Sequence, residues 1–181
     1  MSGSDVSGQA FALTVMTPIA PGAQDALRAS LEGLRDGGAR GPLARLEGTH
    51  FGRWVIVPDF VADKVPDPDR LATPQLLFTA CFDGDLDSWL DELTTKLAPE
   101  AAAIWGRCAG APEPAAGAAL KAYLLAHRIK TGFFVAAYGD ATVGEVRAAL
   151  RRREALIAFA QRAQELEPAA LQREFHERFG S

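Results

Sequence analysis

A histidine and an arginine lie close together in a segment that should form a β-strand. The run Thr49–Val57 is rich in β-branched and aromatic residues and is followed by Pro58, which predicts a strand. His50 could act as a general base, a hydrogen-bond donor or a metal ligand, because histidine changes its charge near neutral pH. Arg53 could hold a substrate carboxylate with its planar guanidinium group. Because side chains alternate along a strand, the two residues should project to opposite faces unless a bulge intervenes.

The neighbours of His50 predict a space beside its imidazole ring. In a regular strand, His50 shares its face with Gly52, Trp54 and Ile56. Because Gly52 has no side chain, it would leave room for a flat ligand. We therefore predict His50 as the catalytic residue. The structural alternative is a histidine that is hydrogen-bonded at the end of a strand or at a dimer seam.

Arg53, Trp54 and Tyr138 are the predicted substrate-binding residues. Tyr138 should end the last strand, where its hydroxyl group could reach the mouth of a cavity. Arg53 could instead pair with a structural acid such as Asp83 or Asp87, which leaves both roles open for this side chain.

The remaining titratable side chains give weaker signals. His127 lies in a basic turn, and His176 lies in a charged C-terminal segment that should leave it exposed. The acidic residues at positions 83, 85, 87 and 91 could suggest calcium, but position twelve counted from Asp83 is Thr94, where an EF-hand needs glutamate. Capping of a helix start explains these carboxylates better, so we predict no metal site.

Composition and motifs narrow the classes of function. A net charge of −4 and a pI near 5.4 argue against nucleic acid as a partner. Cys81 and Cys108 have no C-x-x-C spacing, and no apolar run is long enough for a membrane helix. The polar N-terminus does not resemble a signal peptide, so we expect a cytoplasmic protein that does not bind a membrane. No nucleotide-binding, serine-hydrolase or zinc-protease motif is present.

The order of the expected elements predicts a single α+β domain. Strands are expected at residues 11–16, 49–57, 75–82 and 131–138, with amphipathic helices around residues 27–34 and 86–97. This order is β-α-β-β-α-β, a ferredoxin-like arrangement at residues 10–140. Residues 1–9 should be a disordered N-terminal tail. Residues 141–181 should form a C-terminal helical extension packed on the same domain, with a long helix after Thr142 and a short one at residues 168–179.

The predicted strands are apolar on both faces. In the first strand Phe11, Leu13 and Val15 oppose Ala12 and Met16. The helices of the chain can cover one face of the sheet, but the other face also needs a cover. We therefore expect a homodimer in which the second faces of two copies pack together.

The order of elements, the two-faced strands and the stretch from His50 to Trp54 resemble the dimeric α/β-barrel superfamily, as does the stretch from Phe78 to Leu90. This superfamily includes small monooxygenases, EthD-like proteins, and the dye-decolorizing peroxidase and chlorite dismutase group. The resemblance covers roughly residues 10–150. It implies a dimeric barrel and oxygenase-like or peroxidase-like chemistry. In the heme-binding members a histidine on a helix holds the iron, but His127 and His176 do not match that motif, so the cofactor is unknown and heme is only a candidate.

Two functions follow from these observations. The first is a barrel that binds a small aromatic or lipophilic molecule, and this barrel could be an oxidoreductase. The alternative is a non-catalytic dimeric accessory protein that uses the C-terminal helices, from Thr142 to Phe179, to bind a partner protein.

Overall fold

The structure is a computed structural model that describes residues 5–36, 41–60 and 70–180. The chain divides into two compact units, Met1–Val143 and Gly144–Ser181, close to the boundary predicted at residues 140 and 141. The predicted loop between Pro58 and Pro74 lies partly outside the described residues.

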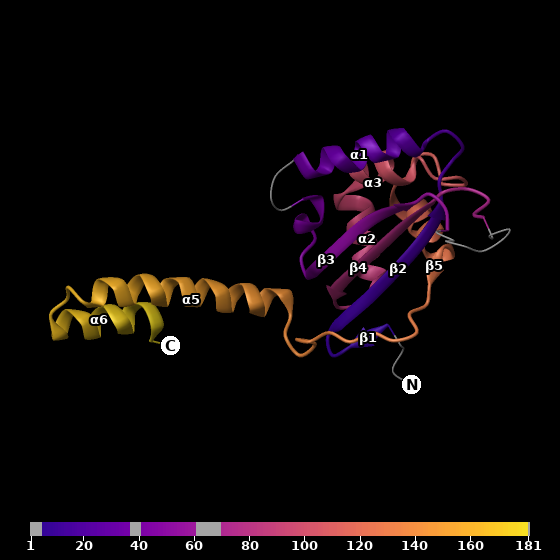
Figure 1. Ribbon diagram of the computed structural model, residues 1–181. Helices are drawn as coiled ribbons and strands as arrows, with labels where there is room; N and C mark the ends of the chain where they lie inside the picture. The colour runs from indigo at the N-terminus through magenta and orange to yellow at the C-terminus, as the bar shows by residue number, and fades with distance from the viewer. Residues whose placement is uncertain (1–4, 37–40, 61–69, 181) are drawn as a thin grey trace. The chain divides into compact units, whose positions relative to one another are not determined.

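The first unit contains an antiparallel sheet, and the whole protein is of the α+β class. Its strands are β1 (Val6–Ser7), β2 (Ala10–Pro18), β3 (Thr49–Val57), β4 (Gln75–Asp83) and β5 (Arg128–Ile129). Their order is β1-β2-β4-β3, and β5 also pairs with β2 (Figure 1). The three long strands confirm the predictions for residues 11–16, 49–57 and 75–82.

The strand predicted at residues 131–138 was wrong, because this segment is irregular and the last strand is the two-residue β5. Its backbone amides find partners outside a ladder: Thr131 N donates to Asp5 Oδ1 (2.8 Å) and Ala136 N donates to Ser7 Oγ (3.0 Å). The expectation of a disordered N-terminal tail at residues 1–9 was wrong for residues 5–9. Residues 5–9 include β1 and the buried Asp5, while residues 1–4 lie outside the described residues.

Helices of the first unit cover one face of the sheet (Figure 1). They are α1 (Gln24–Asp36), the short 3-10 helix η1 (Pro42–Arg45), α2 (Leu86–Lys96), α3 (Ala98–Trp105) and α4 (Gly117–Ala126). Helix α2 begins after Asp85, whose side chain accepts a hydrogen bond from Ser88 N (2.9 Å). The capping interpretation of this carboxylate is therefore confirmed.

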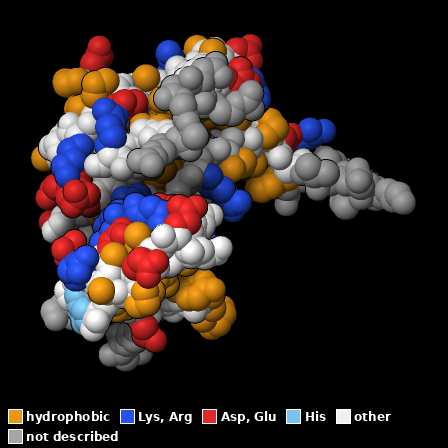
Figure 2. Space-filling model, turned by 90° about the vertical axis from the view of Figure 1, so that its left-hand side faces the viewer, with side chains coloured by type: hydrophobic (Ala, Val, Ile, Leu, Met, Phe, Trp, Pro, Cys, Tyr) orange, Lys and Arg blue, Asp and Glu red, His pale blue; other side chains and the backbone are white. Residues whose placement is uncertain are grey.

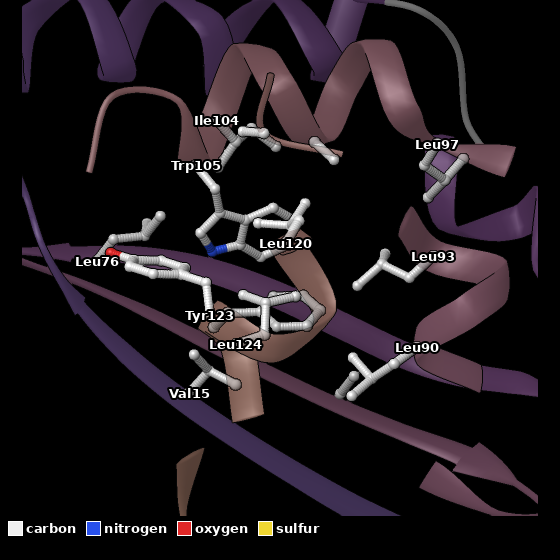
Figure 3. Packing of buried hydrophobic residues seen from close by; sticks show 14 of the residues in the cluster. Val15, Leu76, Leu90, Leu93, Leu97, Ile104, Trp105, Leu120, Tyr123 and Leu124 are labelled. Atoms are coloured by element: carbon white, nitrogen blue, oxygen red, sulfur yellow. The ribbon is translucent and has the colours of Figure 1, made fainter. Parts of the chain in front are cut away.

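The core lies between this face and the helices. Figure 3 shows Trp105 of α3 close to Tyr123 of α4, with Leu76 of the sheet beside that tyrosine and Val15 below it. Phe82 and Trp89 stack at 4.2 Å between ring centroids, and the indole nitrogen of Trp89 donates to Thr49 Oγ1. These contacts fix which face of β2, β3 and β4 is buried.

The second unit contains a pair of helices, as the sequence predicted: α5 (Val143–Ala163), whose first residue belongs to the first unit, and α6 (Pro168–Phe179). The ring of Phe159 packs on Phe175 and Phe179, and Arg162 pairs with Glu174 at 2.5 Å. On the face of the molecule in Figure 2, basic and acidic side chains are intermixed, with hydrophobic groups scattered among them.

Within the described part of the chain, no helix combines the length and the apolar character needed to cross a membrane.

Candidate functional site

A β-bulge in β3 changes the face on which His50 lies. The register pairs Thr49 with Phe82 and Phe51 with Cys81, so His50 has no partner of its own in β4. Its imidazole Nε2 lies 2.7 Å from Oδ1 of Asp83. Because Asp83 follows Phe82 in β4, its side chain projects to the face that the helices do not cover.

This bulge overturns the prediction that His50 and Arg53 lie on opposite faces. Arg53 pairs with Thr79, and alternation along β4 puts Thr79 on the same face as Asp83. An extra residue in one strand shifts the side chains that precede it relative to those that follow. His50, Asp83 and Arg53 therefore belong to one face of the sheet.

Asp83 is the residue that holds His50 in place. Its second carboxylate oxygen, Oδ2, accepts a hydrogen bond from Val143 N at 2.8 Å. The side chains of His50 and Asp83 are only 24% and 14% exposed. With Nε2 fixed by a carboxylate, the imidazole can offer Nδ1 to a ligand, either as an acceptor or as a donor.

The space predicted beside Gly52 does not exist. A Cβ atom built on Gly52 would lie 2.5 Å from Cδ1 of Leu43, so the side chain of Leu43 in η1 fills this position. His50 also lies on the other face. Gly52 therefore does not provide the slot for a flat ligand that was predicted beside His50.

Trp54 and Tyr138 lie in surroundings other than those predicted. The indole of Trp54 stacks on Phe78 at 4.9 Å between ring centroids and belongs to the covered face. Tyr138 lies in the irregular segment that was predicted as a strand, and its side chain is 81% exposed. Trp54 therefore does not share a face with His50, as a regular β3 would have required, and Tyr138 does not end a strand. Their part in binding a substrate stays a prediction.

Arg53 does not form the structural ion pairs considered for it. Asp83 is hydrogen-bonded to His50, and Asp87 pairs with Lys121. Arg53 Nε donates instead to Thr79 Oγ1 at 3.2 Å. Among the residues that the structure describes, no carboxylate lies within ion-pair distance of Arg53.

The surroundings of Arg53 are mostly apolar. We call the uncovered side of the sheet the open face. The register places on it the following residues: Ala12, Thr14, Met16, Phe51, Arg53, Val55, Leu77, Thr79, Cys81 and Ile129. Phe51 is 59% exposed, and Val55 and Ile129 are 38% and 43% exposed. The exposed apolar side chains therefore lie at two edges of the open face, on β3 and on β5, whereas Cys81 between them is only 4% exposed.

Two other possibilities for a site carry less chemistry. Where the chain is described, no three His, Cys, Asp or Glu side chains gather as a metal ion would require. A shallow hollow lies between the start of α1 and residues 72–74, and it contains none of the predicted site residues.

The roles of Asp83 and Phe51 were missed in the sequence. The sequence signal for Asp83 was its position directly after the strand predicted at residues 75–82. The end of this strand should lie beside the start of the strand that contains His50, if the two are antiparallel neighbours. Searches against models of known protein families, curated protein sequences and solved structures found no match.

Proposed function

We propose that this chain binds a small aromatic or lipophilic molecule that carries an acidic group, and that it does so on the open face. The observation that supports this most strongly is Arg53, a cation without a carboxylate partner among the described residues, which lies between Phe51 and Val55 on the open face of the edge strand β3. An apolar surface with one well-placed charged group is the usual composition of a small-molecule site.

The same proposal includes a ferredoxin-like fold and a homodimer. The order β5-β2-β4-β3, with α1 and then α2 to α4 as the connections, is what a β-α-β-β-α-β chain of that kind would give. A second copy that covers the open face would enclose the ligand between two sheets. A cytoplasmic location is part of the proposal, and it is supported by the two free, buried cysteines.

The chemistry within reach of this site is proton transfer. A neutral imidazole whose Nε2 is held by a carboxylate can accept a proton at Nδ1, as a general base does. His50 would then act on an acidic hydrogen of the ligand while Arg53 holds its anionic group. An oxygenase-like or peroxidase-like reaction is suggested by the superfamily resemblance alone, and oxygen consumption with a bound ligand would test it.

Binding of 2-naphthoate, measured by isothermal titration calorimetry, tests the role of Arg53. Replacing Arg53 with Met removes the charge and keeps most of the side-chain length. We expect the affinity for 2-naphthoate to fall about tenfold, the equivalent of one charge-assisted hydrogen bond, with little change for neutral 2-methylnaphthalene. The control is Arg45→Met, because Arg45 pairs with Glu100 on the helical side. Equal binding of 2-naphthoate to Arg53→Met and wild type would refute the site.

A second ligand pair tests His50. The hydroxyl group of 2-naphthol can donate a hydrogen bond to Nδ1, whereas 2-methoxynaphthalene cannot. We expect His50→Ala to weaken 2-naphthol about fivefold relative to the methyl ether, which corresponds to one neutral hydrogen bond. If both ligands respond alike, His50 has no part in the site.

The competing function is a non-catalytic accessory protein. One observation favours it: the second unit is compact in itself and exposes Leu150 and Leu156, which are 51% and 50% exposed. In that case capture of a partner should require this unit, and the ligand tests above should be negative.

A further inference from the structure

We propose that residues 5–9 and residues 130–134 are alternative partners for one edge of strand β2. In the structure residues 5–9 hold this edge. When they are displaced, β5 lengthens along β2 and the side chain of Phe133 moves from solvent onto the open face. This inference goes beyond the ligand site and does not depend on it.

The pairing of β5 with β2 shows where a longer β5 would run. Thr14 pairs with Ile129, and Met16 N donates to His127 O at 3.1 Å. In an antiparallel ladder the hydrogen-bonded pairs recur at every second residue, so Thr14 and Ile129 form such a pair. The next one would lie two residues further along each strand.

Asp5 takes both hydrogen bonds of that next pair, which would be Ala12 with Thr131. Ala12 N donates to the backbone oxygen of Asp5 at 2.8 Å, and Thr131 N donates to Oδ1 of the same residue at 2.8 Å. The other carboxylate oxygen of Asp5 pairs with Arg128 of β5. Asp5 is therefore inserted between the two strands at the point where β5 ends.

Strand β1 takes the following position on the same edge. Ser7 pairs with Ala10, which is the residue that Phe133 would face if the register of β5 continued. The hydroxyl oxygen of Ser7 accepts from Ala136 N at 3.0 Å, so β1 also holds the later segment away from β2. Figure 1 shows the chain after β5 passing β1 on its way to α5.

Residues 131–138 have the composition of a strand without its pairing. They contain no charged residue and no proline, and Phe133 and Val135 are 84% and 66% exposed. A bend at Gly132 separates them from β5, and glycine can adopt the extended backbone that a longer strand needs. Ala10 pairs with Asp83 in β4, so a Phe133 opposite it would lie on the open face.

Disulfide formation in the full-length protein distinguishes the two pairings. Ala10→Cys is the common anchor: Ser7→Cys reports the observed pairing and Phe133→Cys the alternative. The Cα atoms of a hydrogen-bonded antiparallel pair lie about 5.5 Å apart, which suits a disulfide. Val135→Cys is the matched control, because it is exposed on the same segment but lies two residues beyond the partner of Ala10. Ala10→Cys alone controls for Cys81 and Cys108, which are buried.

The rates of cross-linking under mild oxidation, followed by mass spectrometry, give the result. With Asp5 present, the Ser7→Cys pair should cross-link at least tenfold faster than the Phe133→Cys pair. Asp5→Ala removes a charge-assisted hydrogen bond from Thr131 N, so it should speed the Phe133→Cys cross-link about tenfold. The Val135→Cys control should keep its rate.

Ser7→Ala provides a second, milder displacement, because it removes only the acceptor of Ala136 N. It should speed the Phe133→Cys cross-link about threefold. A segment that is released without pairing would cross-link equally through Phe133→Cys and Val135→Cys. That result, or a Phe133→Cys rate that neither displacement raises, would overturn the proposal. Failure of the naphthoate test would refute the ligand site and leave these rates unaffected.

Discussion

Asp83 links the candidate site to the stability of the fold, and its replacement gives a sharp prediction. One carboxylate oxygen contacts His50 and the other accepts from the amide of Val143, a residue that is 7% exposed. Asp83→Ala removes both partners. Leaving the buried amide of Val143 without a partner should lower the free energy of unfolding by about 1–3 kcal/mol. Loss of the hydrogen bond to His50 should lower it by about 0.5–1 kcal/mol more, because this imidazole can turn to water. We expect a total loss near 3 kcal/mol.

Asp83→Asn should be much less harmful than Asp83→Ala. Its amide oxygen can accept from Val143 N, and its amino group can donate to a neutral His50. Both hydrogen bonds survive and only the charge is lost, for which we expect about 1 kcal/mol. For a chain of this length, each kcal/mol lowers Tm by roughly 2–4 °C, so the alanine variant should melt about 6–12 °C lower.

Urea unfolding followed by tryptophan fluorescence measures these losses. All three tryptophans lie in the first unit, so the signal reports the unit that contains Asp83. Asp87→Ala is the matched control, because its exposed ion pair with Lys121 should contribute well under 1 kcal/mol. Equal losses for the asparagine and alanine variants would refute the hydrogen-bond argument, and a wild-type midpoint for Asp83→Ala would refute the contacts themselves.

Two further predictions concern the N-terminal segment and η1. Burial of Asp5 would raise the pKa of its carboxyl group, but hydrogen bonds from Thr131 and the charge of Arg128 outweigh this and hold the pKa below 3.8. Its contribution to stability is therefore present above pH 3.8 and is lost as the pH falls through the folded-state pKa. Acid titration of the free energy of unfolding should show this loss in wild type and not in Asp5→Asn. Gly52→Ala should destabilise by about 0.5–1.5 kcal/mol, because its Cβ forces the end of the Leu43 side chain to turn away, and Leu43→Ala in the same chain should remove most of that penalty in urea unfolding. Additive losses would show that Leu43 does not fill the space at Gly52.

Local pattern was sufficient for most elements of this protein. The strand Thr49–Val57 and the helix Pro168–Phe179 have the bounds that β-branched residues, prolines and helical periodicity predict. These signals arise within a few residues of one another, so no knowledge of the tertiary structure is needed to read them. The segment at residues 131–138 was mispredicted, because its apolar composition favours a strand while its amides bond to Asp5 and Ser7.

The sequence by itself determined the α+β class, the two-faced strands and the identity of His50 and Arg53 as candidates. Only the tertiary structure decided that these two side chains share a face with Asp83 while Trp54 lies in the core. The reason is the bulge at His50. A single extra residue reverses the side-chain alternation on one side of it, and whether a strand contains one depends on its pairing with a neighbour that lies far away in the sequence.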